Sequence, residues 1–390
     1  MASYPKPARR RANREGTIYH SPAENRWRAA LTWTDEAGKR HRRIVSAKTQ
    51  GEVRRKLGAL RADLDRGMAP VKTDTVAAYL AAWLERERQR VRPSTWRGRD
   101  HHARAYLVPA IGTVPLDKLT PAHVERMTAD LVASGRSPRT ASHARVTLRR
   151  ALSDAVRDGL VHRNVAALAR PPRVTRRTIE PGRDYLDAAQ LRRLLTVATE
   201  YRVGALVTVA ATTGLRQGEL LGLSWDDIDW QDGTLTVRRS LARAWDGGYE
   251  LATPKTGRSR RSVNLASVTV DALRREEREQ HAEWQAAGSA WQDTDRLVFT
   301  DAVGRPHNPD TVRRAFHELL RATGLPRVPF HGLRHSAATA LLSAGVPLRV
   351  VSDLLGHSGI AITADYYAHV ERDLRREAAD AMDRALGGRP

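Results

Sequence analysis

The 390-residue sequence predicts a multidomain protein that is mainly α-helical with small β-sheets, the α+β class. Three observations lead to this prediction. The chain is too long for one ordinary hydrophobic core and long enough for two or three domains. Residues 16–48 alternate with the period of β-strands, whereas residues 73–172 follow the period of helices. From residue 185 onward the two patterns are mixed.

The first module, residues 1–70, is expected to form a three-stranded sheet and one helix. In RWRAALTWT four apolar residues fall on one strand face: Trp27, Ala29, Leu31 and Trp33. RHRRIVSAKT predicts a further, arginine-rich strand after the turn EAGK. A helix is expected from about Thr49 to Asp65, because its apolar residues follow one stripe.

Residues 73–172 predict a helical domain. One helix is expected to restart after Pro93, and another to start at Thr120–Pro121 and stop at Gly135. SPRTASHARVTLRRALSDAVRDGLV predicts a further helix. The proline- and arginine-rich stretch ARPPRVTRRTIEPGRD, residues 169–184, then indicates a basic linker, which we place at residues 173–184.

Residues 185–390 predict a mixed domain of helices and small sheets. LDAAQLRRLLTVA indicates a capped helix and YRVGALVTVAATTG a helix buried on most sides. GTLTVRRSLARA is expected to be one strand, and GGYELATPKTGRSRRSVNL a hairpin-like basic stretch. The tail is expected to be a helix with one apolar stripe, formed by Leu374, Ala378, Met382 and Leu386.

The composition favours a nucleic-acid partner. Lys and Arg number 66 against 44 Asp and Glu, a net charge of +22 that suits a polyanion, nucleic acid before membrane. The absence of cysteine excludes disulfides and thiolate chemistry. No secretory signal and no apolar run of about 18–20 residues is present, so we expect a soluble protein of the cytoplasm, associated with the nucleoid, and no membrane contact.

Four segments of the last domain carry candidate site residues. TTGLRQGELLGLSWDDID contains Arg216 and, three residues later, Glu219. TPKTGRSRRS contains Lys255, and HGLRHSAAT contains His331 and Arg334 on one expected helix face. LLGHSGIAITADYYAHV adds three further residues: His357, Tyr366 and Tyr367. Taken singly, each has an ordinary explanation as a surface ion pair, a loop lysine, a helix histidine or a packed tyrosine.

Together, their order Arg, Lys, His-x-x-Arg, His, Tyr resembles that of the tyrosine recombinases, the phage integrase family. ATTGLRQGELLGLSWDDID, PFHGLRHSAATALLSAG and VVSDLLGHSGIAITADYYAHV are similar to the signature boxes of that family. Residues 73–172 resemble its helical, SAM-like core-binding domain, and residues 1–70 its arm-type DNA-binding module. Residues 185–390 would then form the mixed α/β catalytic domain, ending in a packing helix.

The resemblance implies a site-specific integrase that cuts and rejoins attachment-site DNA through a 3′-phosphotyrosyl intermediate, for integration and excision of a mobile element. Arg216 and Arg334 would stabilise the charge that develops on the phosphate, since a guanidinium can donate two parallel hydrogen bonds to two phosphate oxygens. Lys255 would protonate the leaving 5′-oxygen. His331 would bind the phosphate or accept the phenol proton, two roles that stay open.

His357 would bind a non-bridging oxygen, and Glu219 would orient the Arg216 region. Adjacent helical residues point about 100° apart, so only one of the two tyrosines can face the phosphate. The family's nucleophile is typically followed by x-His, which Tyr367 satisfies with Ala368 and His369. Tyr367 is therefore the expected nucleophile and Tyr366 a packing residue.

The mechanism that the resemblance implies requires neither a metal nor another cofactor, and the sequence has no P-loop and no dinucleotide fingerprint. The implied partners are double-stranded DNA attachment sites, three further copies in a homo-tetramer, an excision or directionality factor and a DNA-bending host protein. Two alternatives are a topoisomerase of type IB, which shares the chemistry, and a non-catalytic DNA-binding regulator.

Overall fold

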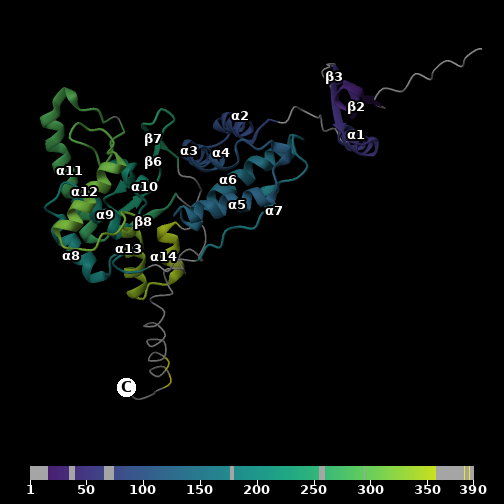
Figure 1. Ribbon diagram of the computed structural model, residues 1–390. Coiled ribbons are helices and arrows are strands. Elements are labelled where there is room, and N and C mark those ends of the chain that lie inside the picture. Colours follow the sequence, from purple (N-terminus) through teal and green to yellow (C-terminus); the bar gives the residue numbers. More distant parts are fainter. Residues whose placement is uncertain are drawn as a thin grey trace, which may run out of the picture. The chain divides into compact units, whose positions relative to one another are not determined.

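The protein is described by a computed structural model that covers residues 16–34, 40–65, 74–175, 180–253, 260–293 and 295–356, together with Met382 and Leu386. The chain divides into two compact units, Met1–Thr175 and Arg176–Pro390. Helices predominate, and the sheets are small and antiparallel (Figure 1). This architecture confirms the predicted α+β class.

The predicted N-terminal module contains the three expected strands and the helix. β1 (Thr17–Ser21), β2 (Arg26–Thr34) and β3 (Arg40–Ala47) form an antiparallel sheet with β2 in the centre. Helix α1 (Gln50–Asp65) packs on one face of this sheet. Ala29 and Leu31 of β2 are fully buried there, in one cluster with Leu57 of α1. The predicted apolar face of β2 is therefore the face that α1 covers.

The predicted helical domain is an assembly of six α-helices within residues 74–175. They are α2 (Val76–Arg88), α3 (Pro93–His102), α4 (Val108–Ile111), α5 (Pro121–Ala133), α6 (Pro138–Arg157) and α7 (Val165–Leu168). A π-helical turn, Ala103–Leu107, joins α3 to α4. Helix α3 begins at Pro93 itself rather than after it, because the first helical position needs no N–H donor. The expected start at Pro121 is confirmed, with Thr120 as the N-cap.

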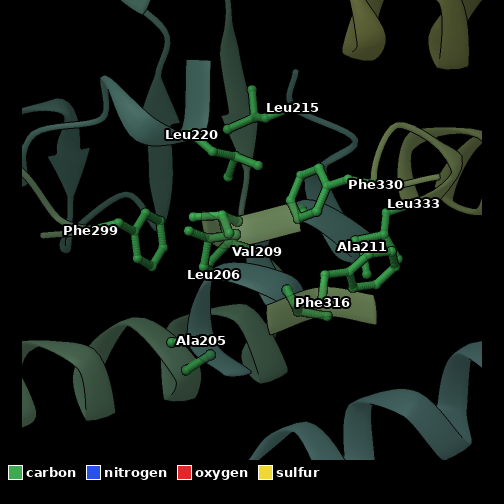
Figure 2. Packing of buried hydrophobic residues seen from close by; sticks show 14 of the residues in the cluster. Ala205, Leu206, Val209, Ala211, Leu215, Leu220, Phe299, Phe316, Phe330 and Leu333 are labelled. Atoms are coloured by element: carbon green, nitrogen blue, oxygen red, sulfur yellow. The ribbon is translucent and has the colours of Figure 1, made fainter. Parts of the chain in front are cut away.

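The second unit is built around a central buried helix. Its helices are α8 (Ala188–Ala198), α9 (Gly204–Thr213), α10 (Gln217–Leu221), α11 (Ser267–Ala287), α12 (Pro309–Ala322), α13 (Gly332–Ser343) and α14 (Leu348–Leu355). Helix α9 is buried along nearly its whole length, as its apolar sequence predicts. Figure 2 shows Leu206 and Val209 of α9 among residues from other segments, including Phe299, Phe316 and Phe330.

The prediction of one strand over GTLTVRRSLARA was wrong, because the segment forms two strands in different sheets. β5 (Thr234–Thr236) pairs with β4 (Ile228–Asp229) and β8 (Ser262–Asn264), whereas β6 (Ser240–Arg243) pairs with β7 (Tyr249–Ala252). Between β5 and β6, the guanidiniums of Arg238 and Arg239 both contact the buried carboxylate of Asp227. Leu235, Val237 and Leu241 share one alternating set of positions across this break, so the apolar pattern did not reveal the change of sheet.

The prediction of a hairpin within GGYELATPKTGRSRRSVNL was also wrong, because the two described strands of this stretch lie in different sheets: β7 pairs with β6, which precedes the stretch, and β8 pairs with β5. The predicted tail helix lies almost wholly outside the described residues; Met382 and Leu386, which the structure does describe, are exposed. No described helix is long and apolar enough to cross a membrane.

A buried polar contact joins α2 to α6 in the helical domain. The indole nitrogen of Trp83 donates to Asp154 Oδ2 at 2.9 Å, and both side chains are almost fully buried. Burial alone would raise the pKa of Asp154, but the hydrogen bond from Trp83 and the charges of Arg150 and Arg157 hold this pKa below its usual value. The carboxylate is therefore ionised at neutral pH.

We predict that Asp154→Ala lowers the free energy of unfolding of the helical domain by about 1–3 kcal/mol, because it leaves the buried Trp83 N–H without its acceptor. Because the folded state depresses the pKa of Asp154, its stabilisation is present at neutral pH and is lost as pH falls through the folded-state pKa. Denaturant titration at neutral and acid pH measures both effects. Asp154→Asn, which keeps an acceptor, is the control; equal losses in the two variants would contradict the prediction.

Candidate active site

Arg216 is placed by a sharp turn between α9 and α10. Gly214 ends α9 with a φ of 63°, in the left-handed region, and Arg216 then occupies the N-cap position of α10. A Cβ on Gly214 would lie 2.3 Å from Leu355 Cδ2. Both the backbone conformation and the close approach of α14 therefore favour glycine here.

A buried carboxylate holds the Arg216 side chain. Arg216 Nη1 donates to Glu219 Oε1 at 2.7 Å, and the Arg216 backbone N–H donates to Oε2 at 3.0 Å. Glu219 is 4% exposed, whereas the side chain of Arg216 is 40% exposed. The buried carboxylate thus fixes the orientation of the guanidinium, while part of the Arg216 side chain remains exposed to solvent.

A second arginine, Arg261, contacts the same carboxylate. Its Nη2 donates to Glu219 Oε2 at 3.0 Å, and its Nε donates to the carbonyl oxygen of Leu354 at 2.7 Å. Burial alone would raise the pKa of Glu219, but Arg261 first and Arg216 second hold it below its usual value. Glu219 is therefore a buried anion between two cations.

The last carbonyl groups of α14 are bound by guanidiniums. Arg334, which is 3% exposed, donates from Nη2 to Leu355 O at 2.6 Å and from Nη1 to Gly214 O at 2.8 Å. Arg216 Nη2 donates to Gly356 O at 3.1 Å. With Arg261 on Leu354, three consecutive carbonyls each accept from a different arginine. Carbonyls at a helix C-terminus have no partner within the helix, and cations are favourable there.

His331 lies directly before α13, beside these arginines. The protein atoms around the imidazole lower its pKa by partial burial, and the charges of Arg334 and Arg216 lower the pKa further. Part of the residue nevertheless remains accessible to solvent. Its ring meets that of His335 edge-on, with centroids 5.1 Å apart. The His335 pKa is lowered to about 4, mainly by burial. Both imidazoles are therefore neutral at neutral pH.

The start of α13 is fixed against the segment that precedes α8. A Cβ on Gly332 would lie 2.4 Å from the carbonyl oxygen of Asp184, so glycine permits this close approach. The hydroxyl of Ser336 accepts a hydrogen bond from the Leu186 backbone N–H at 2.8 Å. These contacts hold the helix that presents His331 and Arg334.

Three of the six predicted site residues come together in this region: Arg216, His331 and Arg334. The other three predicted site residues lie outside the described residues: Lys255, His357 and Tyr367. Tyr366, the expected packing residue, also lies outside them. Arg261 was not predicted, since it is one of three arginines in GRSRRS and only its contacts distinguish it. Within the described ranges, no three His, Asp or Glu side chains gather into a possible metal site.

Chemically, this arrangement suits a tetrahedral anion. Arg216 is partly exposed, Arg334 lies beside it at the end of α14, and His331 offers a neutral imidazole that can donate or accept a proton. Guanidiniums bind phosphate oxygens with two parallel N–H bonds. A phosphodiester at this site would therefore meet positive charge and a proton-transfer group together.

Comparison with protein families agrees with this chemistry. Residues 184–373 match the model of the phage integrase family, and residues 75–131 match the N-terminal SAM-like domain of phage integrases. An integrase of Streptomyces ambofaciens is 32% identical, with 96% of this chain and 97% of that protein covered. An integrase of Saccharopolyspora erythraea is 28% identical, with 97% of this chain and 98% of that protein covered.

Solved structures show the same fold. The Tn1549 transposon integrase in complex with transposon right end DNA has a TM-score of 0.67 at 23% identity, covering 80% of this chain and 100% of that one. A lambda integrase dimer bound to a core site has a TM-score of 0.57 at 18% identity, covering 92% of this chain and 96% of that one.

We predict that His331 titrates below the pH range of an ordinary histidine and is neutral at pH 7, because burial and the two guanidiniums oppose its protonation. Arg216→Gln should raise the pKa of His331 toward its usual value, since one of the opposing charges is removed. Histidine-selective NMR titration measures both pKa values. An unchanged His331 pKa in Arg216→Gln would contradict this account of the site.

Proposed function

Since the chain belongs to the phage integrase family and is a tyrosine-type site-specific recombinase that acts in mobile-element integration, we propose that it cuts and rejoins attachment-site DNA through a 3′-phosphotyrosyl intermediate. The observation that carries this proposal is the convergence of Arg216, Arg334 and His331 at the end of α14. His357 directly follows this end in the sequence, and Tyr367 follows ten residues later.

The two arginines supply the electrostatic part of the reaction. A phosphodiester carries one negative charge, and a second develops as the nucleophile attacks. Arg216 and Arg334 bind the non-bridging oxygens and stabilise that charge in a site that their carbonyl and carboxylate contacts already organise. His331, neutral at physiological pH, donates a hydrogen bond to the phosphate or accepts the proton of the phenol.

The covalent step conserves the energy of the broken bond. The phenolate oxygen of Tyr367 attacks phosphorus, the bond from phosphorus to the 5′-oxygen breaks, and Lys255 gives its proton to that leaving oxygen. His357 binds a further non-bridging oxygen. In the reverse reaction a new 5′-hydroxyl attacks phosphorus, the bond from phosphorus to the Tyr367 oxygen breaks, and the strand is rejoined. The exchange therefore consumes no nucleotide cofactor. These three roles rest on the motif positions in the sequence.

We assign the modules as follows: residues 1–70 bind arm-type DNA sites, residues 73–172 bind the core site, residues 173–184 link the domains and residues 185–390 carry the chemistry. The sheet of the first module supports its role. In β2, Arg28 and Thr32 lie on the face opposite the buried Ala29 and Leu31, and Thr32 pairs with the exposed Arg42 of β3. A two- or three-stranded surface with basic side chains can enter a DNA groove.

The proposed active assembly is a homo-tetramer on two double-stranded DNA attachment sites, with each protomer supplying one tyrosine. The lambda integrase structures, a dimer bound to a core site and a tetramer bound to a Holliday junction, support this assembly by analogy. An excision or directionality factor and a DNA-bending host protein are proposed as accessory partners. The proposed location is the cytoplasm, with the protein associated with the nucleoid.

We predict that Tyr367→Phe binds attachment-site DNA but forms no covalent protein–DNA adduct, because it lacks the nucleophilic oxygen. Tyr366→Phe is the matched control and should still form the adduct. Incubation with a nicked suicide duplex traps the intermediate, and denaturing electrophoresis detects it. An adduct from Tyr367→Phe would refute the assignment of the nucleophile.

We predict that deletion of residues 1–70 leaves cleavage of the isolated core site intact and impairs integration into longer attachment DNA. The described active-site residues all lie beyond residue 210, whereas a second DNA contact raises the effective concentration of the assembly. Footprinting of the full-length and truncated proteins compares their contacts. Loss of discrete outer footprints supports an arm-binding module, and a uniform loss of protection rejects it.

A further inference from the structure

Arg261 bridges two segments that meet at the candidate active site. One end of its guanidinium contacts Glu219 of α10, and the other contacts the carbonyl of Leu354 in the last turn of α14. These partners stand 42 and 93 residues from Arg261 in the sequence. The Arg261 side chain is 7% exposed. It is therefore enclosed largely by protein atoms, as Arg334 is.

The backbone of Arg261 is anchored independently of its side chain. Its carbonyl oxygen accepts a hydrogen bond from the Val237 backbone N–H at 2.9 Å, and the next residue, Ser262, begins β8. Ser262 pairs with Thr236 of β5, and their hydroxyls lie 2.8 Å apart. The guanidinium thus projects from a sheet edge, a rigid base for a residue that must position others.

The contacts of Arg261 with Glu219 and Leu354 both lead to residues that the proposed reaction uses. Glu219 holds the guanidinium of Arg216, and Leu354 lies three residues before His357. Six residues before Arg261, in the segment that leads into β8, stands Lys255. Arg261 is therefore connected to three groups proposed to touch the phosphate: to Arg216 through the shared carboxylate of Glu219, and to His357 and Lys255 through a few residues of chain.

We propose that Arg261 is a positioning residue for DNA cleavage: it ties Glu219, and through it Arg216, to the C-terminal turn of α14 that leads to His357. This inference rests on the proposed function. Arg261 does not touch the phosphate; it sets the distance between the first arginine of the site and the turn that precedes the second histidine. Arg334 and Arg216 donate to the next two carbonyls of the same turn, those of Leu355 and Gly356. With Arg261, all three of these consecutive carbonyls are bound by arginines.

The geometry of arginine suits this task better than that of lysine. Nε and Nη2 of one planar guanidinium donate in fixed directions to two acceptors on different elements. A lysine ammonium is a point charge on a flexible stem. It can keep a positive charge near Glu219, but it does not reproduce both contacts at a set separation.

The test compares Arg261→Ala, Arg261→Lys and the control Arg260→Ala, which removes the same charge from an exposed neighbour in the full chain. Two quantities are measured at a temperature where each variant is folded: affinity for attachment-site DNA, and the single-turnover rate of adduct formation on a nicked suicide duplex. For Arg261→Ala we expect a rate about 10²-fold below that of the control with a similar affinity, because a displacement of about 1 Å in a reacting group costs this much. The rate of adduct formation by Arg261→Lys should lie between the rates of Arg261→Ala and Arg260→Ala.

A merely structural role would lower the melting temperature and leave the rate of the folded protein unchanged. An adduct rate in Arg261→Ala equal to that in Arg260→Ala would therefore overturn the inference. If Arg261→Ala does not fold, Arg261→Lys decides in the same way: a rate equal to that of the control overturns the inference, and a reduced rate at unchanged affinity supports it. Absence of an adduct from the wild-type protein would instead refute the proposed function.

Discussion

The site depends on one buried anion, the carboxylate of Glu219. A carboxylate that is 4% exposed is tolerated in the folded chain only when cations and N–H donors compensate for its lost hydration. Arg216 and Arg261 supply those cations, and the Arg216 backbone supplies one of the donors. The same contacts that make the buried charge tolerable orient Arg216. Stability and the organisation of the site therefore come from one interaction.

The end of α14 is the second constraint. Its last carbonyls have no partners within the helix, and three arginines from separate segments meet that need. Two glycines make the arrangement possible: Gly214 allows α9 to end against Leu355, and Gly356 ends α14 in the left-handed conformation. The catalytic boxes, distant in sequence, are thus joined through main-chain oxygens as well as through side chains.

Positive charge has two separate uses in this chain. Most of the 66 Lys and Arg residues suit salt-dependent contact with a DNA backbone, for which position matters little. Arg334 and Arg261 are different, because they are largely buried and each donates to two defined acceptors. Net charge indicates the class of partner, whereas these two buried arginines lie at the proposed site of the chemistry.

The sequence by itself determined the α+β class, the covered face of the N-terminal sheet and the positions of the motif residues. Each of these is encoded by a short-range signal, such as the period of two in β2 or the three-residue spacing of Arg216 and Glu219. Only the tertiary structure decided that β5 and β6 lie in different sheets and that Arg261 contacts Glu219. The contacts of Arg216 and Arg261 with α14 span 140 and 93 residues. No local period or spacing encodes such contacts, because they arise only when the packing of whole elements brings the segments together.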